Sequence, residues 1–274
     1  MKHNKANILY LTRNGLLEPL GQSQVMNYLR GLSKDYSIKL ISYEKPDDLK
    51  DNLAMARAHA DCKAHDIKWT PLVFQPKINR VLLAFKMLKL IWIVRQKVHH
   101  EGVSLIHARS YIPATIALVI NRLMGIPFIF DMRALWPEEL ISAGRIHRGS
   151  FLHRIILKAE RSCLAKSSAV VSLTNAAIDH LKSTYPTEME GQHIVVIPTC
   201  ADLKLFTPKR VENSSHILHG CIGTVLSSWF LIDWLANWIH ISAFLDPNAR
   251  YELITHDNAK NVRKMIDPKN KLIE

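Results

Sequence analysis

The chain has 274 residues, 48% of them apolar, and its formal net charge is +12. This length suits one large domain or two ordinary ones, and the apolar share excludes a disordered chain. Residues 209–274 hold eight Lys/Arg and seven Asp/Glu, which leaves 28 and 17, a net charge of +11, in residues 1–208. A positive field of this kind favours an anionic partner such as a phospholipid surface, a phosphorylated substrate or nucleic acid, although many soluble proteins are simply basic.

Cysteine and histidine spacing gives no sign of a metal centre or a disulfide framework. The four cysteines are scattered without a C-x-x-C pair, and none of the fourteen histidines belongs to an H-E-x-x-H motif. Such cysteines are typical of reduced thiols, so we expect neither disulfides nor a bound metal. The first apolar run is too short for a signal peptide.

The first predicted elements are a strand, a glycine-containing loop and a helix. The apolar run Ile8–Leu11 leads into a loop with Gly15 and Gly21, and a helical pattern follows at Ser23–Leu32. Glycine lets backbone N–H groups approach a ligand closely, and a helix N-terminus favours a phosphate. The spacing matches neither the dinucleotide fingerprint nor the P-loop, so an ordinary strand-to-helix turn remains open.

Strand and helix patterns then alternate along the chain. We predict strands at residues 37–43, 68–74, 103–107, 128–130, 169–173 and 194–197, and helices at residues 47–64, 78–98, 112–124, 151–164 and after Thr174. Repeated strand–helix units indicate a Rossmann-like parallel sheet with helices on both faces. We therefore predict an α/β domain over residues 1–200.

A second, incomplete Rossmann-like domain is expected after a linker at residues 201–215, which two prolines and a polar end suggest. Residues 216–274 are predicted to hold strands at 217–222 and 251–255 and helices at 229–244 and 259–265. Two strands and two helices are too few to cover both faces of a sheet.

Two apolar segments raise the question of a membrane. Residues 78–98 are interrupted by Lys86, Lys89 and Arg95, whose long side chains could snorkel at a bilayer surface, while the alternative is a helix packed on the sheet. Residues 221–245 would place Asp233 near the bilayer centre at a cost of about 3 kcal/mol, so we predict a soluble strand–turn–helix there.

Five motifs in this order resemble glycosyltransferase family 4. The motifs are GLLEPLGQSQVMNYLRGLS (15–33), VSLIHARSYIPATIAL (103–118), GIPFIFDMRALWPEE (125–139), AVVSLTNAAIDHL (169–181) and VVIPTCADLKLFTP (195–208). The last resembles that family's interdomain signature through Ile197, Pro198, Asp202 and Phe206.

The resemblance implies a two-domain GT-B fold and a retaining transfer of a sugar from a nucleotide-sugar donor to a hydroxyl, without a metal or cofactor. In that family the second domain holds the donor nucleotide largely through a pair of glutamates. The sequence ends before such a segment and keeps GCIGTVLSSWFLIDWL (220–235), which resembles that domain's opening strand and loop. The expected alternative to an active enzyme is therefore a truncated, inactive module that binds an acceptor or a membrane.

Candidate site residues lie where the predicted strands end, because ligands bind at the carboxyl ends of parallel strands. The resemblance implies catalytic and phosphate-facing roles for His107 and Arg109, and acceptor-side roles for Asp131, Arg133, Glu138 and Glu139. It places Gly15, Gly21 and Gln22 in a loop near the donor phosphate and acceptor, and Gly223 and Thr224 on the donor side. Purely structural roles for His107, for an Asp131–Arg133 ion pair and for Trp136 remain open.

The resemblance implies a role in cell-surface polysaccharide biosynthesis. Expected partners are a nucleotide-sugar donor, a glycan or lipid-linked acceptor and an anionic membrane surface. The expected location is the cytoplasm, with peripheral association at the inner face of the cell membrane. Nucleic acid is not expected, because the basic residues are dispersed and lack interleaved aromatic side chains.

Overall fold

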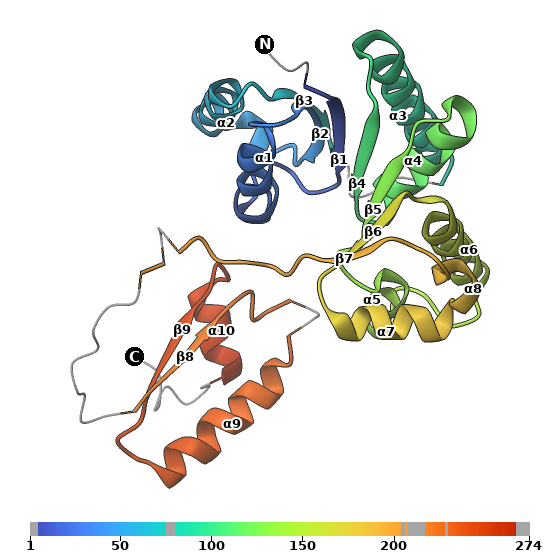
Figure 1. Cartoon of the computed structure of the whole chain (residues 1–274). Helices are drawn as coiled ribbons and strands as arrows, with labels where there is room; N and C mark the ends of the chain where they lie inside the picture. Colours follow the sequence, from blue (N-terminus) through green and yellow to red (C-terminus); the bar gives the residue numbers. More distant parts are fainter. Residues whose placement is uncertain (1–4, 75–79, 204–205, 208–216, 228–229, 267–274) are drawn as a thin grey trace. The chain divides into compact units, whose positions relative to one another are not determined.

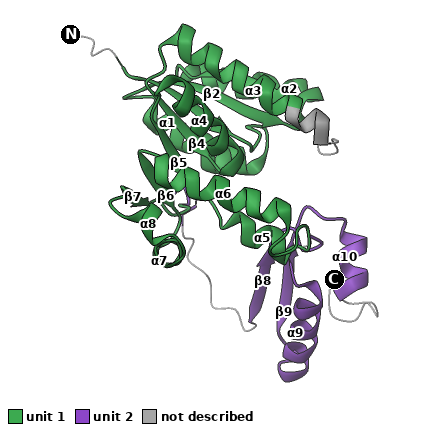
Figure 2. Cartoon of the chain, turned by 90° about the vertical axis from the view of Figure 1, so that its right-hand side faces the viewer, with its two compact units in different colours: residues 1–200 green, residues 201–274 purple. Residues whose placement is uncertain are grey.

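The computed structural model describes residues 5–74, 80–203, 206–207, 217–227 and 230–266. The chain divides into two compact units, residues 1–200 and residues 201–274, which Figure 2 colours separately. The predicted linker at 201–215 belongs to the second unit, and much of it lies outside the described residues.

The first unit contains a seven-stranded parallel sheet with the strand order β3-β2-β1-β4-β5-β6-β7 (Figure 1). The strands are β1 (Asn7–Thr12), β2 (Ser37–Glu44), β3 (Lys68–Val73), β4 (Leu105–Arg109), β5 (Phe128–Asp131), β6 (Ala169–Ser172) and β7 (Ile194–Val196). The predicted Rossmann-like parallel sheet is confirmed.

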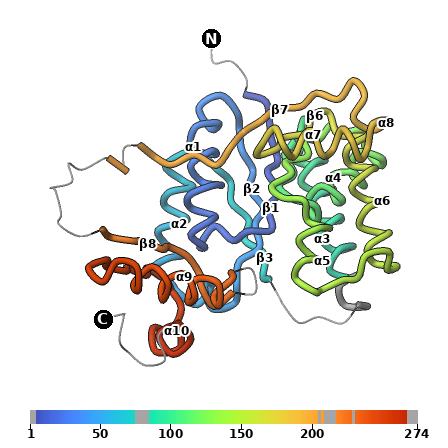
Figure 3. The backbone as a smooth tube through the Cα atoms, turned by 90° about the horizontal axis from the view of Figure 1, so that it is seen from below, coloured from blue at the N-terminus to red at the C-terminus, as the bar shows by residue number. Residues whose placement is uncertain are grey.

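Helices connect these strands and cover both faces of the sheet. They are a π-helix (Gly21–Met26), α1 (Asn27–Leu32), α2 (Asn52–Ala64), α3 (Arg80–Glu101), α4 (Tyr111–Met124), α5 (Trp136–Ser142), α6 (Phe151–Lys166), α7 (Asn175–Thr184) and α8 (Pro186–Met189), with a 3₁₀ turn at Asp48–Lys50. Figures 1 and 3 show α1 and α2 on one face and α3, α4 and α6 on the other. The chain moves in one direction from β1 to β3 and in the other from β4 to β7, so right-handed crossovers put the helices on opposite faces.

The core has one apolar layer on each side of the sheet. Leu9 and Ile106 pack with Val94 of α3 and Ala117 of α4 in the larger cluster, and all four are fully buried. On the opposite face, Tyr10 and Leu40 of the sheet pack with Val25, Leu29 and Ala58. Because successive side chains alternate between faces, β1 contributes Leu9 to one layer and Tyr10 to the other.

Helix α3 packs on the sheet, which is one of the two alternatives that its sequence left open. Leu90, Val94 and Val98 are buried against the sheet, whereas Phe85 and Trp92 on the outer side are 65% and 58% exposed. It is a sheet-packed helix that also shows apolar side chains to solvent. Among the described residues, no helix is both long enough and apolar enough to span a bilayer.

Several boundaries differ from the sequence-based prediction. The predicted strand at 103–107 lies two residues later, at Leu105–Arg109, so Arg109 ends the strand and does not follow it. The short helices α5 and α8 were not predicted, because each is only one or two turns long and too short for a helical period to show. Glu138 and Glu139 consequently lie in the first turn of α5.

The second unit pairs β8 (Leu218–Ile222) with β9 (Arg250–Ile254) in parallel. Helices α9 (Ile232–Leu245) and α10 (Ala259–Ile266) contribute Leu235, Ile239 and Val262 to a small apolar cluster. The strand–turn–helix predicted over residues 221–245 is confirmed, and the unit has the parallel strands and connecting helix of a Rossmann-like fold.

Candidate active site

One row of residues crosses the carboxyl ends of three adjacent strands. Thr12 of β1 is in register with Arg109 of β4, which is in register with Asp131 of β5. Tyr10 and His107 form the preceding row, and their rings stack with centroids 4.5 Å apart. Residues two apart in a strand share a face, so His107, Arg109 and Asp131 project to the same side of the sheet.

The Asp131 carboxylate lies at the centre of three basic side chains. Its Oδ2 lies 3.2 Å from His107 Nε2 and 3.8 Å from Arg109 NH1, and its Oδ1 lies 3.5 Å from Arg133 NH1. The structure therefore brings together four of the predicted site residues. It also shows that the Asp131–Arg133 ion pair is real.

Gln24 connects this cluster to the π-helix that follows the first loop. Its Oε1 accepts a hydrogen bond from Arg109 NH2 at 2.6 Å and a longer one from Arg133 NH2 at 3.4 Å. A π-helix turn inserted into a helix often marks a functional site. The single amide oxygen fixes two guanidinium groups from different segments.

The cluster carries more positive than negative charge and is buried. The side chains of Arg109 and Asp131 are 4% and 5% exposed, whereas Arg133 and His107 are 12% and 17% exposed. Two guanidinium groups face one carboxylate. Among the described residues, Arg109 Nε and NH1 and Arg133 Nε have no hydrogen-bond acceptor. Unpartnered donors of this kind can stabilise an anion.

Burial and neighbouring charges shift the pKa of Asp131 in opposite directions. Burial by itself raises the pKa of this carboxyl group, but the hydrogen bond from His107 and the charges of His107, Arg133 and Arg109 outweigh it and lower the pKa below 3.8. Burial, followed by the charge of Asp131, raises the pKa of the neighbouring Tyr10. Asp131 is therefore a carboxylate and Tyr10 a neutral phenol at neutral pH.

The lowered pKa of Asp131 predicts a pH dependence of stability. The folded state binds this proton more weakly than the unfolded state, so the stabilisation is present above pH 3.8 and is lost as the pH falls through the folded pKa. Urea unfolding of the wild type and of Asp131→Asn should give free energies whose difference shrinks as the pH is lowered through this range. A difference that stays constant down to the lowest pH at which the protein is folded would contradict the ionised state.

The fold of the first loop leaves no room for a side chain at Gly15 or Gly21. A Cβ at Gly21 would lie 1.9 Å from the carbonyl oxygen of Gly15, and a Cβ at Gly15 would lie 2.6 Å from Glu44 Oε2. Glu44 is fully buried and accepts hydrogen bonds from the backbone N–H groups of Leu16 and Leu17 at 2.8 and 3.1 Å. The loop is folded tightly against the carboxyl end of β2.

We expect Gly21→Ala to lower the free energy of unfolding by about 1–3 kcal/mol, because the nearest atoms are backbone atoms that cannot rotate away. Gly31→Ala in α1 is the matched control, since its new methyl group would have nothing within 4 Å. This control should raise stability by roughly 0.5–1 kcal/mol through helix propensity. Urea unfolding of the two variants should therefore give shifts of opposite sign, and equal shifts would contradict the close approach.

The other predicted residues of the first unit lie outside the Asp131 cluster. Gln22 donates from Nε2 to the carbonyl oxygen of Leu16 at 2.7 Å, so it supports the loop. Glu138 pairs with Arg148, with 3.1 Å between Oε1 and NH1, and Glu139 is exposed.

Gly223 and Thr224 belong to the second unit and directly follow β8. The Gly223 N–H donates to the carbonyl oxygen of Ile254 at 3.0 Å. The Asp257 carboxylate accepts from the Leu226 N–H at 3.0 Å, which fixes the end of this loop. The backbone hydrogen bond at Leu226, the first of several causes, lowers the pKa of Asp257.

Sequence reasoning missed Gln24 and Glu44, which connect the first loop to the sheet. Gln24 lies within a motif that carries the family resemblance, but its partners are 85 and 109 residues away in sequence. Glu44 directly follows the strand predicted at residues 37–43 and is the last residue of β2, so an acidic residue at a strand's carboxyl end was the available signal.

The family model that describes glycosyltransferase family 4 matches residues 21–205. The chain belongs to glycosyltransferase family 4. The match extends from the π-helix through β7, so it includes the segments that carry Gln24, Arg109 and Asp131. No curated protein sequence matches this glycosyltransferase.

Solved structures share the fold of this glycosyltransferase at low sequence identity. A glycosyltransferase from Rickettsia africae ESF-5 has a TM-score of 0.60 and 16% identity, over 98% of this chain and 68% of its own. The sucrose-phosphate synthase of Thermosynechococcus elongatus has a TM-score of 0.64 and 13% identity, over 95% of this chain and 66% of its own. Anabaena HepE, solved with UDP and glucose, has a TM-score of 0.57 and 14% identity, over 97% and 68%. The chain thus spans about two thirds of the length of these GT-B structures.

Proposed function

We propose that this glycosyltransferase transfers a sugar from a nucleotide-sugar donor to a hydroxyl of a polysaccharide or lipid-linked acceptor in cell-surface polysaccharide biosynthesis, with retention of anomeric configuration. The observation that carries the proposal is the positive cluster at the carboxyl edge of the sheet, within the segment that matches the family. HepE and a Medicago truncatula glycosyltransferase, similar in fold, were solved with UDP-glucose.

The reaction needs electrostatic support for a departing phosphate and a cationic sugar. The donor's sugar–phosphate bond breaks, the acceptor oxygen forms the new bond, and the acceptor proton and the nucleoside diphosphate leave. Arg109 and Arg133 supply a fixed positive field for the phosphate, and Asp131 orients both groups and His107. While Gln24 holds Arg109 NH2, the Nε and NH1 groups, which have no hydrogen-bond acceptor among the described residues, are the donors available to the phosphate.

Acceptor recognition is assigned to the end of β5 and the residues after it, and recognition of the rest of the donor to the second unit. Asp131, Arg133, Glu138 and Glu139 would shape the acceptor side, and Gly15, Gly21 and Gln22 would hold the loop near the phosphate. Gly223 and Thr224 would contact the donor. No metal or cofactor is assigned, and the nucleotide sugar is a substrate.

A transfer assay tests the proposal. The chain is incubated with a panel of radiolabelled nucleotide sugars and a bacterial membrane extract, and the labelled product is isolated for NMR. We expect label in a lipid or polysaccharide fraction with the donor's anomeric configuration retained. Absence of transfer with every donor would overturn the enzyme proposal, and an inverted product would overturn the retaining mechanism.

A second candidate function is an inactive module that binds an acceptor or the cytoplasmic face of a membrane. It is favoured by α3, where Phe85, Leu88 and Trp92 are 65%, 62% and 58% exposed beside Lys89 and Arg95. Such a surface suits the interface of an anionic bilayer. Vesicle flotation combined with nucleotide-sugar calorimetry separates the two functions, because vesicle binding without nucleotide binding would favour the module.

A further inference from the structure

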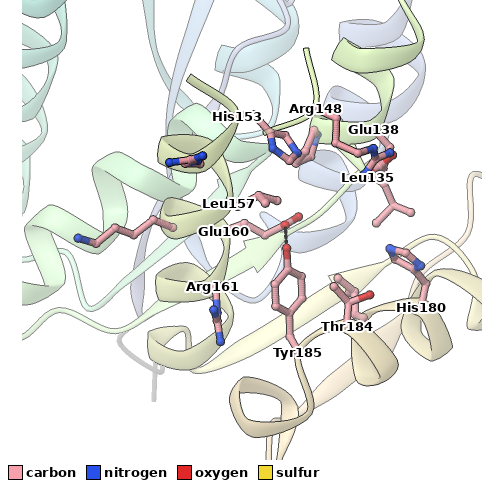
Figure 4. A pocket seen from close by; sticks show the side chains of 14 residues that line it. Leu135, Glu138, Arg148, His153, Leu157, Glu160, Arg161, His180, Thr184 and Tyr185 are labelled. Atoms are coloured by element: carbon pink, nitrogen blue, oxygen red, sulfur yellow. Dashed lines mark hydrogen bonds and ion pairs between the residues drawn. The ribbon is translucent and has the colours of Figure 1, made fainter. Parts of the chain in front are cut away.

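A second basic site lies away from the Asp131 cluster, in a pocket of about 530 Å³ between α5, α6 and α7. Figure 4 shows residues from these helices directed around it, including His153 and Glu160 of α6 and His180 of α7. The buried Glu160 carboxylate accepts a hydrogen bond from Tyr111 at 2.5 Å and another from Tyr185. The pocket therefore has a fixed hydrogen-bonded wall.

Positive charge predominates around this pocket. Arg148 pairs with Glu138, and Arg161 pairs with Glu188. Arg154 and Lys158 also line the pocket, are exposed, and make no ion pair with any other described residue. Two uncompensated cations one helical turn apart suit an anionic group.

His153 adds an unused hydrogen-bond donor. The side chain is only 5% exposed and lines the pocket. The Gly149 N–H donates to its Nδ1 at 3.1 Å, so the neutral ring carries its hydrogen on Nε2. Nε2 has no acceptor among the described residues. An anion in the pocket would supply one.

Apolar side chains stand beside the basic ones on the first turns of α6. Phe151, Leu152 and Ile155 are 81%, 53% and 47% exposed. Phe151 and Ile155 are four residues apart and share one stripe, and Arg154 and Lys158 share the neighbouring stripe. Adjacent basic and apolar stripes are typical of helices that lie in a membrane interface.

We propose that the α5–α6–α7 pocket binds the phosphate of an anionic phospholipid headgroup while Phe151 and Ile155 enter the bilayer interface. Charge complementarity and the adjoining apolar stripe point to a membrane lipid and not to a free anion. The inference extends the proposed membrane association of this enzyme, but the evidence for it is on α6 and not on α3.

Vesicle flotation of the full chain tests this site with phosphatidylcholine alone and with added phosphatidylglycerol. We expect binding only with the anionic lipid, and Arg154→Gln/Lys158→Gln should weaken it about 30-fold, since each basic residue near such a surface contributes about fivefold. The control Lys34→Gln/Lys63→Gln removes the same charge from exposed positions, just after α1 and in α2, and should retain binding. Phe151→Asp should weaken binding, whereas Leu53→Asp in α2 should not.

A pocket-specific measurement uses soluble short-chain phosphatidylglycerol and inorganic phosphate as probes. The lipid should shift the ring nitrogen signals of His153, assigned with His153→Asn, and leave those of His59 unchanged. Equal vesicle binding by the two charge-reduced double variants would overturn the inference, as would a His153 response to inorganic phosphate without vesicle binding.

Vesicle flotation also distinguishes the surface on α6 from the surface on α3. If Trp92→Asp abolishes vesicle binding and Arg154→Gln/Lys158→Gln does not, the α6 inference fails and the α3 proposal stands. Wild-type protein that binds no vesicles would overturn both, while the transfer assay would still decide the enzymatic function.

Discussion

Asp131→Ala should lower the free energy of unfolding by about 3–5 kcal/mol, because it leaves buried positive charge without a counter-charge. Asp131 is the carboxylate shared by His107, Arg109 and Arg133. The alanine side chain cannot accept a hydrogen bond. The Arg109 side chain is only 4% exposed, so water cannot replace the lost carboxylate. Urea unfolding at neutral pH measures this loss.

Asp61→Ala is the matched control for Asp131. Asp61 pairs with Arg30 at 2.6 Å, but these side chains are 22% and 37% exposed. Water can replace much of that interaction, so we expect a loss below about 1 kcal/mol. Similar losses in the two variants would show that Asp131 is no more important than a surface ion pair.

Arg109→Gln should reduce the transfer rate per folded molecule by roughly 100- to 1,000-fold, the effect of removing one fixed donor to a developing negative charge. The substitution removes the positive charge that Gln24 and Asp131 hold in place. The rate is measured with the labelled donor and extract that give transfer with the wild type, after correction for the folded fraction.

Arg57→Gln, at an exposed position in α2, is the control for the loss of charge and should leave the rate unchanged. Gln24→Ala separates positioning from charge, because it retains both arginines but removes their common acceptor. We expect an intermediate rate for this variant. A normal rate per folded Arg109→Gln molecule would assign Arg109 a structural role only.

Local sequence patterns predicted most of the fold because each strand is a short apolar run followed by a helix signal. Helix α7 is an example, since it begins after Thr174 as predicted, and the Thr174 side chain caps it by accepting a hydrogen bond from the Ala177 N–H. The family motifs also indicated the strand ends where His107, Arg109 and Asp131 lie. Their convergence follows from parallel register, which places the carboxyl ends of neighbouring strands at one edge.

Features that depend on contacts distant in sequence could not be predicted in the same way. The hydrogen bonds of Gln24 require the π-helix to face β4, and the role of Glu44 requires the first loop to fold back on β2. Arg109, at the end of β4, is buried and its guanidinium contacts Gln24, which is likewise a contact between segments distant in sequence. The sequence places Gly15 and Gly21 in the first loop. The close approach of Gly21 to Gly15 is seen only in the folded backbone.

We propose above all that the positive cluster at the carboxyl ends of β4 and β5 receives the donor phosphate. NMR of the arginine Nε–H groups during a titration with UDP tests it most directly. We expect the signals of Arg109 and Arg133, assigned by substitution to lysine, to shift while the signal of Arg57 does not. If UDP leaves the Arg109 and Arg133 signals unchanged, the phosphate does not bind at this cluster and the proposed role of these arginines is wrong.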